Sequence, residues 1–454
     1  MTSIFARRAR LATGWARDVA VTVTDGKIGE VRPNASAATG AVLVDTLLPA
    51  LANVHSHSFQ RAMAGMTEYR SAGRDSFWTW RDLMYRFANK ITPDEVEAIA
   101  ALVFMEMQER GYASVGEFHY LHHQPGGAPY AALDEMSQRI FAATALTGIG
   151  LTLLPVLYIY GGAGEKPLAP EQLRFGNDVD RFSRLVAAAR RAGSAAGPDV
   201  LVGVAPHSLR ATSPADLHEI IALYTDYQIH IHIAEQPKEV EEVGAWLKGR
   251  PVEWLLDHAP VNDRWCLVHA TQMTDAETKA LAASGAVAGL CPITEANLGD
   301  GPFNGRLYLE ARGAFGIGSD SNVRISLTEE LRTLEYSQRL RDRSRNILAA
   351  GSPSVGETLY LGAAVGGAKA LGRHCGAIET GLLADLVAID SEGPALCALG
   401  DARLLDGLCF AAADDVVTDL WSAGRHAVRD GRHQARDAIV ATYRGAIERL
   451  VTNI

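Results

Sequence analysis

Two histidines separated by a single residue, His55 and His57, close an apolar stretch that begins at residue 47. In a β-strand, residues i and i+2 point to the same side, so both imidazoles would leave the end of this strand together. Neutral imidazole is a common metal ligand, and zinc accepts it readily. A chain with 14 histidines among 454 residues contains roughly 0.4 such pairs by chance, so the pair alone is weak support for a metal site.

Further candidate residues follow, each near the end of another short apolar run. His230 and His232 alternate in one run with Glu235 three residues beyond, His269 ends a second run, and Asp320 ends a third. Three histidines and one carboxylate suit a catalytic zinc that keeps one position for water. Each residue alone has a simpler interpretation, such as a buried core histidine or an N-cap aspartate. Their joint occurrence favours a metal site in which His232 is the ligand, because Glu235 follows it, and His230 is structural.

The elements that would position these residues repeat along the chain. From about residue 47 onward, helical patterns alternate with short apolar runs, which is the signature of parallel βα units. One segment, residues 92–111, predicts a helix that begins after Thr92 and stops at Gly111. Eight apolar runs end near His57, Tyr120, Tyr158, His207, His232, His269, Cys291 and Asp320. Eight such units predict an α/β fold, a (β/α)8 TIM barrel, whose active site lies at the C-terminal ends of the strands.

Both chain ends have β-strand patterns. Apolar and polar residues alternate on either side of Asp25-Gly26, which predicts a hairpin, and residues 375–435 contain short strands separated by glycine turns. We expect the two ends to form one small β-sandwich domain. The predicted division is therefore 1–46 for the first part of that domain, 47–372 for the barrel, and 373–454 for the rest of the small domain with a terminal helix.

Composition excludes several classes of protein. A hydrophobic content of 48% and a charged content of 21% indicate a large packed core. The net charge of −10 and the lack of a Lys/Arg block argue against nucleic acid as a partner. Five widely spaced cysteines without a Cys-x-x-Cys motif indicate neither a disulfide framework nor a cysteine zinc site.

No membrane partner is expected either. Residues 141–164 are uncharged and reach the length of a membrane span, but Gly148, Gly150 and Pro155 interrupt them. They predict the end of a helix followed by a buried strand. The first residues show no continuous apolar run of the secretory kind, so the expected location is cytoplasmic.

The order of these motifs resembles that of the amidohydrolase superfamily: HSH in the first run, histidines in the fifth and sixth, Ser-Asp at the eighth, and a C-terminal GAIETGLLADLVAID. More specific stretches are similar to those of the formimidoylglutamate deiminase family, namely HSHSFQRAMAG, SFWTWRDLMYR, EFHYLHH, PHSLRA, HIHIAEQ, CPITEANLGDG and LEYSQRLRDR. The resemblance spans nearly the whole chain. It implies zinc-dependent hydrolysis of N-formimidoyl-L-glutamate to N-formyl-L-glutamate and ammonia in histidine degradation, by a homodimer.

The resemblance also implies a metal set and catalytic roles. One zinc ion per chain would be bound by His55, His57, His232 and Asp320. A single metal is favoured because the only lysines between His57 and His232 are Lys90 and Lys166, and neither ends a predicted strand where a bridging lysine would lie. Asp320 would also accept a proton from the attacking water. His269 would hydrogen-bond the reacting centre, and Glu235 would protonate the leaving nitrogen.

The implied substrate carries two carboxylates, which guanidinium groups bind well. Arg210 follows the fourth strand, and Arg81 lies in the long segment after the first, which would fold over the mouth of the barrel. Gln60, Tyr120 and His207 would add hydrogen bonds. Two alternatives stay open: a deaminase of a neutral heterocycle such as guanine, against which the two arginines argue, and a non-catalytic scaffold, against which the complete set of ligands argues.

Overall fold

The computed structural model describes residues 2–69 and 77–452. Ser76, the first residue of the SFWTWRDLMYR stretch, lies outside the described residues. Within the described part, no helix is both long enough and apolar enough to cross a membrane. Residues 141–164 hold instead the end of helix α3 (Glu135–Thr147) and the buried strand β7 (Gly150–Leu157), as the interrupted pattern predicted.

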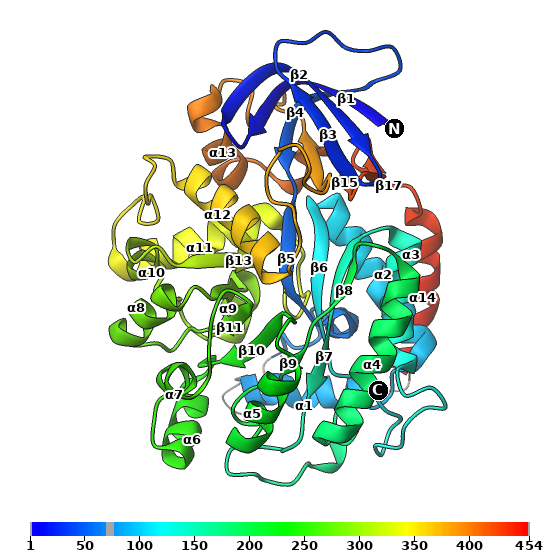
Figure 1. The fold of residues 1–454 in the computed structure, drawn as a ribbon, viewed down its shortest axis with the longest axis vertical. Coiled ribbons are helices and arrows are strands. Elements are labelled where there is room, and N and C mark those ends of the chain that lie inside the picture. Colours follow the sequence, from blue (N-terminus) through cyan, green and yellow to red (C-terminus); the bar gives the residue numbers. More distant parts are fainter. Residues whose placement is uncertain (1, 70–76, 453–454) are drawn as a thin grey trace.

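A closed parallel barrel forms the body of the molecule (Figure 1). Besides β7, its strands are β5 (Leu51–Ser56), β6 (Tyr112–His119), β8 (Val200–Val202), β9 (Ala205–Pro206), β10 (Ile229–Ile233), β11 (Trp265–His269), β12 (Val287–Leu290) and β13 (Ala314–Ile317). The hydrogen-bonded order is β10-β11-β12-β13-β5-β6-β7-β8, and parallel bridges from Val204 to Ile229 and from Ser208 to His232 close the ring. The predicted (β/α)8 barrel is confirmed, with its fourth strand split into β8 and β9.

The helices surround this barrel. They are α1 (Phe77–Ala88), α2 (Pro93–Glu109), α3, α4 (Val179–Ala196), α5 (Pro214–Leu223), α6 (Pro237–Leu247), α7 (Pro251–His258), α8 (Asp275–Ser284), α9 (Pro292–Leu298), α10 (Gly305–Glu310), α11 (Leu327–Asp342) and α12 (Val355–Ala370), with 3₁₀ turns η1 (Ser58–Met63) and η2 (Pro170–Gln172). The start of α2 is a capping box between Thr92 and Glu95, and Gly111 follows its end at φ +95°. The predicted bounds of this helix are therefore confirmed.

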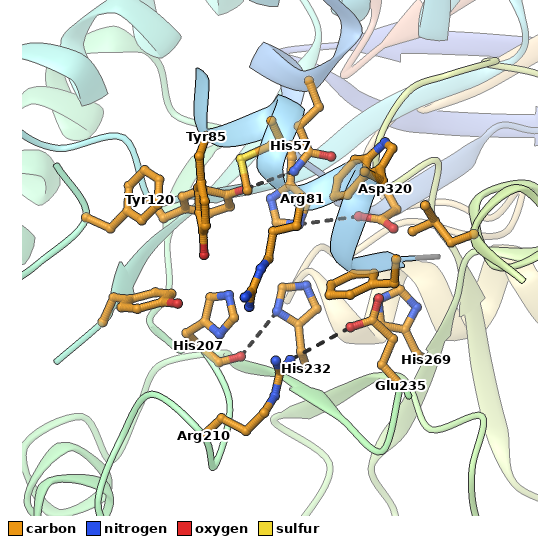
Figure 2. A pocket seen from close by; sticks show the side chains of 17 residues that line it. His57, Arg81, Tyr85, Tyr120, His207, Arg210, His232, Glu235, His269 and Asp320 are labelled. Atoms are coloured by element: carbon orange, nitrogen blue, oxygen red, sulfur yellow. Dashed lines mark hydrogen bonds and ion pairs between the residues drawn. The ribbon is translucent and has the colours of Figure 1, made fainter. Parts of the chain in front are cut away.

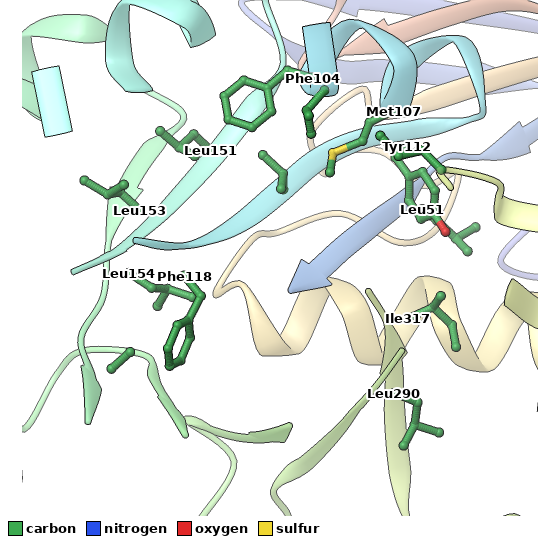
Figure 3. Packing of buried hydrophobic residues seen from close by; sticks show 14 of the residues in the cluster. Leu51, Phe104, Met107, Tyr112, Phe118, Leu151, Leu153, Leu154, Leu290 and Ile317 are labelled. Atoms are coloured by element: carbon green, nitrogen blue, oxygen red, sulfur yellow. The ribbon is translucent and has the colours of Figure 1, made fainter. Parts of the chain in front are cut away.

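One hydrophobic core lies between the strands and the helices (Figure 3). Every residue of β6 and β7 is buried, because helices cover the outer face of the sheet and side chains fill the inside. Phe104 and Met107 of α2 join Leu51, Leu151 and Ile317 in this core. This rigid packing is what holds the strand ends, and hence the site, in place.

The two chain ends form a second sheet. Its strands are β1 (Thr2–Leu11), β2 (Gly14–Thr24), β3 (Lys27–Arg32), β4 (Val42–Pro49), β14 (Leu386–Ile389), β15 (Val417–Ser422), β16 (Arg425–Arg429) and β17 (Arg432–His433), in the order β17-β16-β15-β14-β4-β1-β2-β3. The antiparallel pair β4–β14 joins the two halves, which confirms the small β-domain built from both ends. The hairpin at Asp25 and Gly26 is also as predicted, with both residues at positive φ.

Three further elements of the described chain complete the C-terminal part: α13 (Asp401–Phe410), η3 (Asp414–Val416) and α14 (Arg436–Thr452), which packs on α2 of the barrel (Figure 1). The division expected after residue 46 falls inside β4, which leads through Ala50 directly into β5. The first barrel strand, which carries His55, is therefore anchored at its start by the sheet of the small domain.

Candidate active site

The four predicted metal ligands meet at the C-terminal end of the barrel. His55 lies in β5, His57 follows that strand, His232 lies in β10, and Asp320 follows β13. The Nε2 atom of His55 is 3.1 Å from Nε2 of His57 and 3.0 Å from Nε2 of His232. Oδ1 of Asp320 is 3.4 Å and 3.3 Å from the first two of these nitrogens. One ligand atom from each of the four buried residues lies within 4.8 Å of all the others.

The donor set fits a metal ion. Ligand atoms about 2.0–2.2 Å from a tetrahedral zinc lie roughly 3.3–3.6 Å from one another, close to the separations found here. Nδ1 of His57 is 2.9 Å from the Phe118 carbonyl oxygen, and Nδ1 of His232 is 3.2 Å from that of His207. Since a carbonyl only accepts, each Nδ1 carries the proton and each Nε2 presents a lone pair to the cluster.

Burial favours the same ligand-ready state. It lowers the pKa of His55 to about 3 and also lowers the pKa of His57, so both rings are neutral at pH 7. The Nε2 atoms of His57 and His232 both direct lone pairs toward Nε2 of His55, and a cation held between the three nitrogens and Asp320 would accept these lone pairs. The arrangement therefore suits a divalent metal.

Two backbone hydrogen bonds bring the ligands of β5 and β13 together. The Asp320 N–H donates to the His55 carbonyl at 2.9 Å, and the His57 N–H donates to the Asp320 carbonyl at 2.8 Å. Asp320 itself has φ +45°, an unusual conformation for a non-glycine residue and one that recurs at functional sites. Gly318 allows the close approach, because a Cβ there would lie 2.8 Å from Cβ of His55.

His269 and Glu235 lie beside the four candidate ligands, which are together called the metal cluster. Nε2 of His269 is 3.9 Å from Oε1 of Glu235. Burial raises the pKa of Glu235 to about 7, against the opposing charges of His269 and Arg210. Burial alone would lower the pKa of His269, but Glu235, Glu295 and Asp320 together raise it to about 10. A carboxyl with a pKa near neutral, Glu235, and a histidine that stays protonated at neutral pH, His269, thus adjoin the cluster.

One pocket contains the rest of the predicted site (Figure 2). Arg81 enters it from α1, and Arg210 enters from the segment after β9. The Arg81 guanidinium carbon lies 4.4 Å from the centroid of the Trp78 ring, and Arg210 Nη2 lies 3.9 Å from carboxylates of Glu235 and Glu239. The Nε atoms of both arginines are buried and have no hydrogen-bond partner among the described residues. Two guanidinium groups with unused donors indicate an anionic ligand.

The predicted hydrogen-bonding residues line the same pocket. Gln60 donates through Nε2 to the Tyr120 hydroxyl at 2.8 Å, while its buried Oε1 has no partner within the described part of the chain. His207 packs against His232, with ring centroids 4.9 Å apart, and its Nδ1 is 3.0 Å from Oγ of Ser208. Gln60 and His207 therefore keep polar atoms available for hydrogen bonds to a ligand in the pocket.

All the predicted site residues thus lie in or directly against one pocket, with His55 at its buried base. His230 does not join them: its Nε2 is 2.8 Å from the Ala370 carbonyl oxygen, as expected of a structural histidine. Sequence reasoning missed several lining residues, namely Phe77, Trp80, Met84, Tyr85, Tyr158, Phe175 and Leu298. Tyr158 ends a predicted strand, and that position was a usable signal. The others lie in α1, in the loop before α4 and at the end of α9, and carry no such pattern.

Comparisons with known proteins agree with this geometry. A family model described as the amidohydrolase family matches residues 46–426, and one described as formimidoylglutamate deiminase HutF, N-terminal domain, matches residues 1–42. Formimidoylglutamate deiminase of Pseudomonas aeruginosa is 47% identical over 440 residues, which cover 96% of this chain and 97% of that protein. A 5-methylthioadenosine/S-adenosylhomocysteine deaminase of Natronomonas pharaonis is 25% identical and covers 94% of this chain and 91% of its own.

Solved structures extend the similarity to three dimensions. An amidohydrolase from Brucella melitensis has a TM-score of 0.95 at 46% identity, with 99% of this chain and 100% of that chain covered. An adenosine deaminase from Xanthomonas campestris with bound zinc shares the fold, with a TM-score of 0.82 at 24% identity over 99% of this chain and 98% of its own. This chain therefore belongs to the amidohydrolase family and, within it, to the formimidoylglutamate deiminases.

Proposed function

We propose that this chain hydrolyses N-formimidoyl-L-glutamate to N-formyl-L-glutamate and ammonia, a step of histidine degradation. The observation that carries the proposal is the pair Arg81 and Arg210, whose buried Nε atoms lack partners in the described part of the chain and which share one pocket with the metal cluster. A dicarboxylate with a hydrolysable amidine satisfies both features at once. The identity of 47% to a formimidoylglutamate deiminase supports the same substrate.

His55, His57, His232 and Asp320 would hold one zinc ion. When bound, zinc supplies Lewis-acid chemistry, lowering the pKa of a water to about 7 and polarising the group under attack. Three neutral imidazoles and one carboxylate are the donor types that zinc prefers, and Lys90 and Lys166 lie far along the chain from the strand-end position that a bridging lysine would need.

Asp320 accepts a proton from water, whose oxygen adds to the formimidoyl carbon. His269 donates a hydrogen bond through Nε2 to the reacting centre and stabilises its charge. Glu235 delivers one proton to the leaving nitrogen and the proton taken by Asp320 follows, so that the carbon–nitrogen bond breaks and ammonia departs, while the hydroxyl proton of the intermediate returns to Glu235. The leaving nitrogen thus gains two protons, the water loses two, and the water oxygen stays on the carbon as the formyl group. The raised pKa of Glu235 supports its role as an acid near neutral pH.

The rest of the pocket binds the glutamate part. Arg210 and Arg81 pair with its two carboxylates, and the Gln60 side chain accepts from an N–H of the substrate through Oε1. Tyr120 holds Gln60 in place through its hydrogen bond. His207, which packs against His232, donates a further hydrogen bond to the substrate. These contacts would orient the amidine carbon over the cluster.

An ammonia-release assay tests the proposal with N-formimidoyl-L-glutamate, N-formimidoyl-glycine and guanine as substrates. We expect N-formimidoyl-L-glutamate to give the highest kcat/KM by at least about 10-fold, since each lost charged contact costs roughly 1.5–3 kcal/mol. Faster turnover of guanine would move the assignment to a purine deaminase. Absence of turnover of all three by the zinc-loaded protein would favour the non-catalytic scaffold.

We also propose one zinc per chain, a homodimer and a cytoplasmic location. Two-fold symmetric dimers are the commonest oligomers of soluble proteins, which supports the second point. Elemental analysis together with light scattering on the purified protein measures the first two directly. Two tightly bound metals per active chain, or a monomer at working concentration, would contradict them.

A further inference from the structure

We propose that Glu295 is a positioning residue that fixes the orientation of His269, a role that rests on the proposed function. Glu295 lies in α9, on the side of His269 that faces away from Glu235. Its Oε1 atom is 3.3 Å from Nδ1 of His269 and accepts the Cys291 backbone N–H at 2.8 Å. Both Glu295 and His269 are buried, at 5% and 1% exposure, so water does not compete for this contact.

The two nitrogens of His269 have separate tasks. A carboxylate only accepts, so Nδ1 of His269 carries a proton and donates a hydrogen bond to Glu295. Nε2 is then left to face the pocket, where Glu235 lies 3.9 Å away. The ring is also stacked on His232 at 9° between planes, with centroids 5.5 Å apart. Stacking sets the plane of the ring, and the bond to Glu295 decides which nitrogen faces the substrate.

Glu295 acts through His269 and not on the substrate itself. It is absent from the residues that line the catalytic pocket, whereas His269 is among them. On its other side Glu295 borders a separate groove between α9 and α11. His269, Cys291 and Glu295 also lie close enough to one another to hold a metal ion. However, Oε1 of Glu295 is already engaged by the Cys291 backbone N–H and by Nδ1 of His269, which favours the histidine contact as the role of this group.

A second buried glutamate provides a matched control. Glu330 of α11 accepts the Ile293 backbone N–H at 2.8 Å, at the same corner between β12 and α9. It is 0% exposed, and among the described residues it has no hydrogen bond to a side chain that lines the pocket. Glu295→Leu and Glu330→Leu each remove one such backbone hydrogen bond, so their structural costs are comparable. Only the first removes the partner of His269.

Zinc-loaded variants are compared in steady-state turnover of N-formimidoyl-L-glutamate. We expect Glu295→Leu to lower kcat by about 10²-fold with little change in KM, as misplacing a catalytic group does. Glu330→Leu should stay within about 10-fold of the unmodified enzyme. Glu295→Gln should keep most activity, because the Cys291 N–H holds the amide oxygen where Oε1 of Glu295 was. Zinc content should be unchanged in all three. Equal kcat for the two leucine variants, or zinc lost only from Glu295→Leu, would overturn the proposal.

A spectroscopic measurement keeps the test independent of turnover. In protein labelled with ¹⁵N-histidine, the His269 ring should show a protonated, hydrogen-bonded Nδ1, assigned by its loss in His269→Asn. The signal should persist in Glu295→Gln and vanish in Glu295→Leu. An unprotonated Nδ1 in the unmodified protein would overturn the proposal even if the leucine variants failed to fold. If the unmodified enzyme released no ammonia from N-formimidoyl-L-glutamate, the proposed function would fail while this signal still tested Glu295.

Discussion

At the scale of single residues, burial decides what each polar side chain does. Gln60, Arg81 and Arg210 carry buried polar atoms that no described residue satisfies, although such atoms are nearly always paired in folded proteins. The chain is acidic overall, with a net charge of −10, so these arginines form a local exception. Unused donors and acceptors beside a metal cluster are a cost to folding that binding of the right ligand would recover.

Arg210→Met tests the carboxylate contact. A hydrogen bond to a charged group contributes roughly 1.5–3 kcal/mol, so kcat/KM for N-formimidoyl-L-glutamate should fall by at least 10- to 100-fold. An analogue without the contacted carboxylate should lose little, and zinc content should be unchanged. Steady-state kinetics of both substrates on both proteins gives a double-mutant cycle. Arg306→Met is the control, because it makes the same substitution at a side chain that is 60% exposed and outside the pocket. Its kcat/KM should stay close to that of the unmodified enzyme. Equal losses on the two substrates would show that Arg210 is structural.

Glu235→Gln tests the proposed acid. An amide cannot deliver the proton that the leaving nitrogen needs, so kcat should fall by about 10²-fold or more, a typical size for a positioned acid. The metal should be retained, because Glu235 is not among the four residues of the cluster. Turnover and zinc content are measured on the same preparation. Near-normal turnover would assign the acid to another residue.

At the scale of elements, the barrel strands bring distant residues to one edge. The ends of β5 and β13 come close enough to share a metal because Gly318 has no side chain between them: a Cβ there would lie 2.8 Å from both Cβ and the carbonyl oxygen of His55. Backbone atoms cannot yield as a flexible side chain can. The separation of the two strands, and with it the spacing of the ligands, therefore depends on this glycine.

Gly318→Ala should push β13 away from β5 and displace His55 relative to Asp320. We expect zinc affinity to fall by about 10- to 100-fold, as is typical when the support of a metal ligand is altered. Competition with a chromogenic chelator measures that affinity. Gly400→Ala is the matched control, because an added Cβ at Gly400 meets nothing within 4 Å and its φ is −75°. Equal zinc affinity in the two variants would contradict the role of Gly318.

At the scale of the whole molecule, a buried ion network joins the two domains. Arg373 donates to the Asp199 carbonyl at 2.8 Å and lies 3.1 Å from the Asp385 carboxylate. Arg425 of β16 approaches Asp199 at 2.6 Å. Asp199 precedes β8 of the barrel, whereas Asp385 precedes β14 of the small domain. The Arg373 side chain is 1% exposed, so its contacts to both carboxylates lie away from solvent, whereas the Arg425 side chain is 41% exposed.

Arg373→Met should lower the free energy of unfolding by about 3–5 kcal/mol, because the buried Asp385 carboxylate loses its counter-charge and Asp199 keeps only Arg425. Thermal or urea unfolding measures the change. Arg32→Met, which breaks a pair more than half exposed on both sides, should cost less than about 1 kcal/mol. Similar destabilisation by both variants would show that burial adds nothing to the Arg373 network.

Stability should also depend on pH through Asp199. Burial alone would raise the pKa of this carboxyl, but Arg425 and Arg373 hold it below its ordinary value of 3.8. A carboxyl whose pKa is lower in the folded than in the unfolded protein stabilises the folded state. This stabilisation is complete above the ordinary pKa of the carboxyl and is lost as the pH falls from there through the folded-state pKa. The stability difference between the unmodified protein and Arg373→Met should therefore narrow below about pH 4. A difference that stays constant down to pH 2 would contradict this origin.

The sequence by itself determined the kinds and the order of the elements, and most of the site. Apolar runs of strand length, each followed by a helical pattern, predicted the barrel, and the barrel rule placed His55, His269 and Asp320 at one edge. This works because strand and helix periodicities are local properties, and because parallel strands present their C-terminal ends together. Glycine and N-cap signals likewise predicted the bounds of α2 and the first hairpin.

Only the tertiary structure decided what depends on depth and on contacts distant in sequence. The sequence predicted His232 as the ligand because Glu235 follows it, and the structure adds the physical reason: His230 lies deeper in the barrel against Ala370, whereas His232 reaches the cluster. Glu295 lies behind His269, 26 residues away in sequence, and Arg373 joins Asp199 to Asp385 across the domains. No local pattern encodes these pairs, because each forms only after the barrel has closed and its neighbours have packed.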